Sequence, residues 1–112
     1  MPVTYMKAAR VEDISLGQVK TFDIEREHIT ICNVDDVFYA INDFCSHDGG
    51  MLGRGELHGN IIECSRHGAR FDVTNGKAMA PPAVRPIRTF PVRVNDGYIE
   101  VGIEVSNRRH SR

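Results

Sequence analysis

Two short runs of the sequence carry cysteine and histidine at a spacing that suits metal ligands. The first is Cys45-Ser46-His47, and the second, Cys64-Ser65-Arg66-His67, begins after a gap of sixteen residues. Each run supplies one thiolate and one imidazole, so together they form a four-ligand set. Two such pairs in glycine-rich surroundings argue against chance placement. Two Cys and two His suit tetrahedral zinc as well as an iron–sulfur cluster, so the ligand set alone leaves both open.

The remaining cysteine and the remaining histidines are predicted to lie in the core or at the surface and not to act as ligands. Cys32 lies in a β-rich run with no histidine beside it, which predicts a small buried side chain that packs in the core. His28, His58 and His110 lie in polar or turn contexts and are predicted at the surface.

Short β-rich runs separated by turn residues surround the two ligand runs. One hairpin is predicted over residues 30–41, with Asp35-Asp36 as its tight turn. A second is predicted over residues 90–105, where Asn95-Asp96-Gly97 separates two alternating runs. No stretch of useful length has the helical period. The pattern predicts an all-β, antiparallel fold.

The region between these hairpins has a different composition. Residues 43–84 combine the glycines near the first ligand run with the turns Gly59-Asn60 and Asn75-Gly76 and with Pro81-Pro82. We predict a loop-rich insert that carries the ligands, within a single domain that spans residues 1–112. The basic tail, residues 106–112, is expected to fray.

Composition limits the classes of function. The net charge of −1 over 112 residues gives no reason to expect a nucleic-acid partner. The first residues lack the apolar core of a signal peptide, and no stretch reaches transmembrane length, which predicts a soluble, cytoplasmic protein with no membrane partner. Three cysteines, an odd number, argue against a disulfide scaffold and favour metal or packing roles.

The ligand pattern C-x-H-x16-C-x-x-H resembles that of Rieske [2Fe–2S] ferredoxins that serve aromatic-ring dioxygenases. The similarity continues through residues 64–77, which look like the second cluster loop of that family. Ala80-Pro81-Pro82-Ala83 resembles its third, proline-containing loop. The resemblance implies a Rieske-type antiparallel β-sandwich with a loop-rich cluster-binding subdomain, and it favours an iron–sulfur cluster over zinc.

The resemblance also assigns the ligands. It implies one [2Fe–2S] cluster per chain, with Cys45 and Cys64 on one iron and His47 and His67 on the other. Two ferric ions, two sulfides and two thiolates sum to zero, against −2 for a cluster with four cysteines. Adding an electron to a neutral centre is easier, so histidine ligation raises the reduction potential.

Departures from the respiratory-chain members of the family predict a low potential within its range. Those members carry a disulfide across the cluster loops, where this chain has Gly50 and Arg66. They also place Ser and Tyr hydroxyls as donors to the cluster sulfurs, where this chain has Ala69 and Phe71. Because such donors stabilise the reduced cluster, we expect a potential near the bottom of the Rieske range of about −150 to +300 mV.

The function that the resemblance implies is one-electron transfer from a flavin-dependent ferredoxin reductase to a terminal non-haem iron oxygenase. The chain is expected to be a carrier and not itself an enzyme, since no room remains for a mononuclear iron domain. Three alternatives stay open: a small Rieske subunit of nitrite reductase, a redox accessory protein of iron–sulfur assembly, and a structural zinc module.

Overall fold

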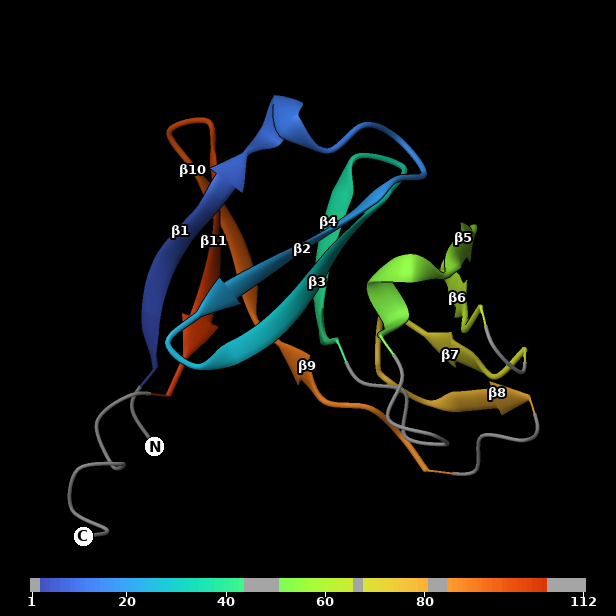
Figure 1. Cartoon of the computed structure of the whole chain (residues 1–112). Helices are drawn as coiled ribbons and strands as arrows, with labels where there is room; N and C mark the ends of the chain where they lie inside the picture. Colours follow the sequence, from blue (N-terminus) through green and yellow to red (C-terminus); the bar gives the residue numbers. More distant parts are fainter. Residues whose placement is uncertain (1–2, 44–50, 66–67, 81–84, 105–112) are drawn as a thin grey trace, which may run out of the picture.

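Antiparallel β-strands make up most of the described chain, which confirms the all-β prediction. The computed structural model describes residues 3–43, 51–65, 68–80 and 85–104. Within these residues the strands form three sheets, which we call sheets A, B and C (Figure 1). The helices of this part of the chain are two three-residue 3₁₀ turns, η1 (Val11–Asp13) and η2 (Leu52–Arg54). Neither is long or apolar enough to cross a membrane.

Hydrogen bonding between neighbouring strands sets their spatial order within each sheet. Sheet A runs from β1 (Thr4–Arg10) through β11 (Tyr98–Ile103) to β10 (Val92–Asn95). Sheet B runs through β2 (Val19–Ile24), β3 (Glu27–Val34), β4 (Val37–Asn42) and β9 (Thr89–Phe90). Sheet C runs through β5 (Glu56–His58), β6 (Ile61–Glu63), β7 (Arg70–Asp72) and β8 (Ala78–Ala80).

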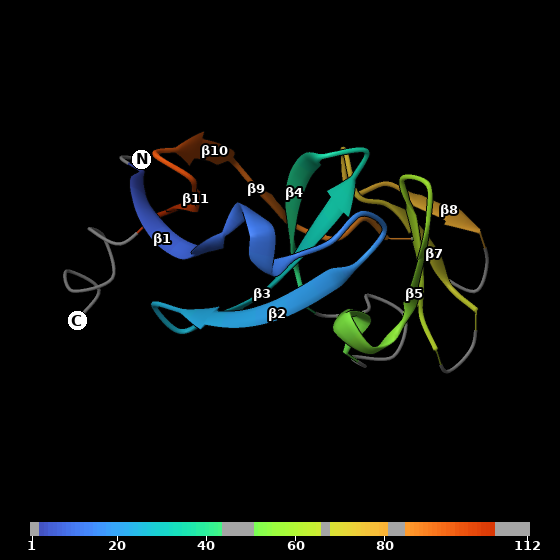
Figure 2. The same ribbon diagram turned by 90° about the horizontal axis from the view of Figure 1, so that it is seen from above.

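Sheet B is the middle layer, with sheet A on one face and sheet C on the other (Figures 1 and 2). Successive side chains of a strand point to opposite faces. On β3, Ile29 and Ile31 pack with residues of sheet A, whereas Cys32 packs in a second core with Ile62 and Phe71 of sheet C. A strand that is covered on both faces has a largely apolar sequence, because its side chains are buried on either side. This explains the largely apolar sequence of β3 from Ile29 onward.

Both predicted hairpins form, each closed by a two-residue turn, but the second begins at Val92, because Phe90 lies in β9 and pairs with β4 of sheet B. Asp35 and Asp36 have φ values of 52° and 67° between the paired ends of β3 and β4. Asp96 and Gly97 have φ values of 56° and 80° between β10 and β11. Positive φ at both central residues is the geometry that matches the twist of antiparallel strands. Asn95 belongs to β10, so the second turn is one residue shorter than predicted.

Three features go beyond the prediction. The β2–β3 hairpin turns at Glu25-Arg26, which adopt φ values of 49° and 73° although neither residue type favours them. Strand β1 pairs with β11 near the start of the chain. The region predicted as a loop-rich insert contains a whole sheet, because β5 to β8 lie within it. The predicted Gly59-Asn60 and Asn75-Gly76 turns connect strands of this sheet.

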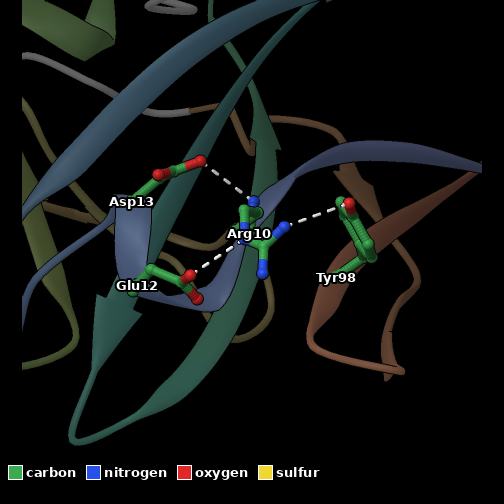
Figure 3. A network of polar contacts seen from close by, with 4 residues as sticks. All are labelled: Arg10, Glu12, Asp13 and Tyr98. Atoms are coloured by element: carbon green, nitrogen blue, oxygen red, sulfur yellow. Dashed lines mark hydrogen bonds and ion pairs between the residues drawn. The ribbon is translucent and has the colours of Figure 1, made fainter.

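A polar network fastens the end of β1 in sheet A, on the side of the molecule away from sheet C (Figures 1 and 3). Arg10 Nε donates to Glu12 Oε2 at 2.8 Å and Arg10 Nη1 donates to Tyr98 Oη at 3.2 Å, while the Arg10 N–H donates to Asp13 Oδ2 at 3.0 Å. The hydrogen bond from Arg10 lowers the pKa of Glu12. Because these side chains are exposed, the network stabilises the fold only modestly.

Candidate metal centre

Cys64 lies immediately after β6, where the chain turns toward β7. Its N–H donates to the Ala69 carbonyl at 2.7 Å, and the Gly68 N–H donates to the Cys64 carbonyl at 3.2 Å. Gly68 has a φ of +76°, a conformation that glycine adopts without a Cβ penalty. These bonds hold both ends of the short connection between Cys64 and Gly68. The backbone at Cys64 and at Gly68 is therefore tied directly to the β6–β7 hairpin.

An apolar core surrounds Cys64, which is 2% exposed. Leu52, Ile62, Ala69 and Phe71 share this core and are fully buried. Buried apolar neighbours keep water away from a thiolate and its metal, and this control of solvent access is one way a protein tunes a metal site. The setting suits a thiolate ligand.

The segment that carries the first ligand run is held at its two ends by Asp43 and Gly53. The Gly53 N–H donates to Asp43 Oδ1 at 2.7 Å, and the Asp43 N–H donates to the His28 carbonyl at 2.8 Å. A Cβ added at Gly53 would lie 2.1 Å from Thr21 Oγ1, so no larger residue fits without a shift. The chain thus leaves sheet B at Asp43 and returns to it at Gly53.

The η2 turn brings the first segment against the second. Leu52 of this turn is buried in the core that contains Cys64. The Gly55 N–H donates to the Leu52 carbonyl at 2.9 Å, and a Cβ added at Gly55 would lie 2.0 Å from the Glu63 carbonyl oxygen. Glycine here permits close backbone approach to the residue before Cys64.

A third anchor joins the β7–β8 turn to the segment that follows residues 81–84. The Ile87 N–H donates to the Gly76 carbonyl at 2.8 Å, and a Cβ added at Gly76 would lie 2.2 Å from the Ile87 carbonyl oxygen. Asp72 caps the turn by accepting from the Thr74 hydroxyl at 2.6 Å. Partial burial by itself would raise the pKa of Asp72, but hydrogen bonds from Thr74 and Asn60 hold it below its usual value.

The structure describes one of the four predicted ligands, Cys64. The other three, Cys45, His47 and His67, lie outside the described residues. In the described ranges no three or more His, Cys, Asp or Glu side chains are grouped to hold a metal ion. The ligand set therefore remains a prediction.

The remaining predictions for cysteine and histidine can be checked in part. Cys32 is fully buried, as predicted, and burial raises the pKa of its thiol to about 12. His28 and His58 are exposed, as predicted. His110 lies outside the described residues.

Residues 4–91 match the family model of the Rieske [2Fe–2S] domain, which covers most of the chain. The chain belongs to the Rieske [2Fe–2S] family. The cofactor of this Rieske protein is accordingly a [2Fe–2S] cluster, and zinc is set aside.

Proteins similar to this Rieske chain include a curated relative and two solved structures. The ferredoxin component of biphenyl 2,3-dioxygenase from Rhodococcus jostii (strain RHA1) is 39% identical over 92 residues, covering 82% of this chain and 86% of that protein. The ferredoxin of carbazole 1,9a-dioxygenase from Nocardioides aromaticivorans IC177 has a TM-score of 0.85 at 33% identity, covering 88% and 96%. A chain in a complex of reduced oxygenase and oxidized ferredoxin in carbazole 1,9a-dioxygenase has a TM-score of 0.82 at 31% identity, covering 87% and 91%. The antiparallel Rieske fold is therefore confirmed.

The described residues of the Rieske protein fit a [2Fe–2S] cluster. Cys64 presents a soft ligand from a buried, apolar position beside a tightly turned backbone, and thiolates are the usual ligands of iron–sulfur clusters. Gly53, Gly55 and Gly76 each allow an approach that a Cβ would block: Gly53 meets the side chain of Thr21, whereas Gly55 and Gly76 meet backbone carbonyl oxygens.

Sequence reasoning missed Asp43 as an anchor of the Rieske site. Its hydrogen bond to Gly53 spans ten residues, so neither residue signals the contact locally. The available signal was an acceptor two residues before Cys45 together with a glycine-rich run.

Proposed function

We propose that this protein is the ferredoxin component of an aromatic-ring dioxygenase system, carrying single electrons from a flavin-dependent reductase to a terminal oxygenase. The observation that carries the proposal is the similarity to ferredoxin components over nearly their whole length. One similar chain comes from a complex of oxygenase and ferredoxin, which supports an oxygenase as the electron acceptor. The catalytic step then belongs to the partner and not to this chain.

Cys45, His47, Cys64 and His67 would hold the cluster, the two cysteines on one iron and the two histidines on the other. When bound, the cluster supplies reversible one-electron transfer. The support from the described residues is the position of Cys64 and the anchoring of the segments on either side. Residues 43–84 would form the cluster-binding part of the chain, mounted on sheet B.

The apolar core beside Cys64 supports a potential at the low end of the family range. Ala69 and Phe71 are both fully buried, and neither side chain carries a hydrogen-bond donor. Fewer donors to the cluster sulfurs leave the reduced state less stabilised. A low potential suits transfer onward to an oxygenase.

Reconstitution tests the proposal. The purified protein is combined with the reductase and terminal oxygenase of a biphenyl or naphthalene dioxygenase system, and NADH-dependent product formation is measured. We expect product only when the ferredoxin is present, and none with Cys64→Ala. Cys32→Ala is the matched control and should retain full transfer. A cluster-loaded protein that is neither reduced by such reductases nor oxidised by such oxygenases would contradict the proposal.

A further inference from the structure

The carboxylate of Glu63 lies near Gly68, and Glu63 directly precedes Cys64 at the end of β6. We propose that the charge of Glu63 lowers the reduction potential of the cluster, and that Arg70 opposes it. This inference rests on the proposed function, because it concerns the potential of the same centre. It assigns the tuning to fixed charges beside the ligands, in addition to the missing hydrogen-bond donors.

One covalent neighbour and one side-chain contact place Glu63 beside Cys64 and Gly68. Its backbone is bonded directly to Cys64, at the end of β6. Its side chain then folds toward the other end of the run, because Glu63 Oε2 lies 3.5 Å from where a Cβ of Gly68 would be. Glu63 therefore lies beside both described ends of the connection, Cys64 and Gly68, and its negative charge is near the backbone that carries the Cys64 ligand.

The charge of Glu63 is partly withdrawn from water and, among the residues that the structure describes, only loosely paired. Its side chain is 32% exposed, whereas that of Glu56 is 80% exposed. Its Oε1 lies 3.7 Å from Arg70 Nε and 3.7 Å from His58 Nε2, beyond good hydrogen-bond distance. Partial burial lowers the local dielectric, so the charge acts over a longer range than a fully solvated one.

Strand register makes Glu63 part of a row of charges across sheet C. Glu56 of β5 pairs with Glu63 of β6, which pairs with Arg70 of β7. In this row Glu63 lies next to Cys64, the basic Arg70 lies on β7, and the more exposed Glu56 lies on β5. A fixed negative charge disfavours the arrival of an electron and a fixed positive charge favours it, so Glu63 and Arg70 should shift the potential in opposite directions.

The test compares three charge-neutralising variants at one fixed pH and ionic strength. Glu63→Gln and Arg70→Gln remove the two charges with little change in shape, and Glu56→Gln is the matched control in the same row. Film voltammetry gives the potential, and the visible spectrum confirms that each variant holds its cluster. We expect Glu63→Gln to raise the potential, Arg70→Gln to lower it, and Glu56→Gln to shift it less than Glu63→Gln does.

A cluster-loaded Glu63→Gln protein with an unchanged or lowered potential would overturn the inference, as would a shift from Glu56→Gln of equal size. Should Glu63→Gln fail to retain its cluster, the sign of the Arg70→Gln shift decides. A rise or no change overturns the inference, and a fall supports it. Wild-type protein without a [2Fe–2S] cluster, or unable to exchange electrons with reductase and oxygenase, counts against the proposed function instead.

Discussion

Glycine residues have different structural roles in the sandwich of sheets A and B and in the ligand-bearing half that contains sheet C. In the turns of sheets A and B, Gly17 and Gly97 adopt φ values of +75° and +80°, and an added Cβ would have nothing within 4 Å. Around the metal centre, a Cβ at Gly53, Gly55 or Gly76 would lie between 2.0 and 2.2 Å from an oxygen atom. At these positions the sandwich uses glycine for backbone torsion and the ligand-bearing half uses it for close approach. Other glycines depart from this division: Gly102 of β11 is also tightly packed, with an added Cβ 2.5 Å from Val3 Cγ1, and Gly68 beside Cys64 serves torsion.

This difference follows from how each half is stabilised. Strands β2, β3 and β4 are six to eight residues long and pair along their length, so many hydrogen bonds fix their positions. The strands of sheet C are three residues long. Such short strands define a ligand position only with additional contacts, and the glycine approaches provide them. Gly59, at the tip of sheet C, is a further exception in this half, because an added Cβ there would have nothing within 4 Å, as at Gly97.

The largest expected effect is a difference between variants of Cys64 and Cys32, two buried cysteines of the same core. Cys64→Ala should abolish the cluster, because it removes a ligand, while Cys32→Ala should keep it and lower the free energy of unfolding by about 1 kcal/mol. Iron and acid-labile sulfide per chain are the measurements, with about two of each expected in the wild type and in Cys32→Ala. Equal loss of the cluster from both variants would indicate that Cys32 is also part of the cluster site.

Replacing Gly76 and Gly97 by alanine tests the difference between glycines that allow close approach and glycines that allow a positive φ. Gly76→Ala combines a positive φ with a collision against the Ile87 carbonyl oxygen, and we expect it to cost about 3 kcal/mol or more of unfolding free energy. Gly97→Ala has only the torsional penalty of about 1–2 kcal/mol. Urea unfolding gives both values, and the rate of bleaching gives cluster loss. Equal costs for the two changes would remove the distinction between torsion and approach.

The anchor at Asp43 should have an intermediate effect. Asp43→Ala leaves the Gly53 N–H without its acceptor, at a cost of about 1–3 kcal/mol, and should accelerate cluster loss. Asp43→Asn keeps an acceptor oxygen and should restore much of the retention. Asp23→Ala, on an exposed carboxylate that pairs with His28, is the control for charge. Rapid cluster loss from the asparagine variant as well would assign the effect to the charge of Asp43 and not to its hydrogen bond.

The smallest expected effect concerns the potential. Phe71→Tyr adds a hydroxyl in the core beside Cys64, and one hydrogen bond worth about 1 kcal/mol to the reduced cluster corresponds to a rise of roughly 40 mV. Phe90→Tyr makes the same change in the core between sheets A and B and should leave the potential unmoved. Voltammetry of both variants, each with an unchanged visible spectrum, is the measurement. A Phe71→Tyr potential equal to that of the wild type means that the hydroxyl points elsewhere.

Sequence was sufficient where the determinant is local. Asp35-Asp36 and Asp96-Gly97 predict their turns because these residue types tolerate positive φ. Glu25-Arg26 carries no such preference, and its conformation follows from the pairing of β2 with β3 on either side. Strand β1 was missed because its pairing with distant β11 defines it.

The candidate site shows the same limit. The burial of Cys32 could be predicted from its residue type and its β-rich surroundings, and the ligand role of Cys64 stays a prediction. The contacts that hold the segments in place could not, because Gly55 meets Glu63, and Gly76 meets Ile87, only after the chain has folded.

The placement of β3 between two cores has a consequence for how the protein opens. Its neighbouring residues Ile31 and Cys32 point into different cores, so the strand is held by packing on both of its faces. A slip of one residue would exchange the two sets of side chains and expose both cores to mismatched partners. The β3 amides should therefore exchange their hydrogens only through global unfolding, whereas the short strands of sheet C can open locally. Assembly or loss of the cluster then need not disturb the sandwich beneath it.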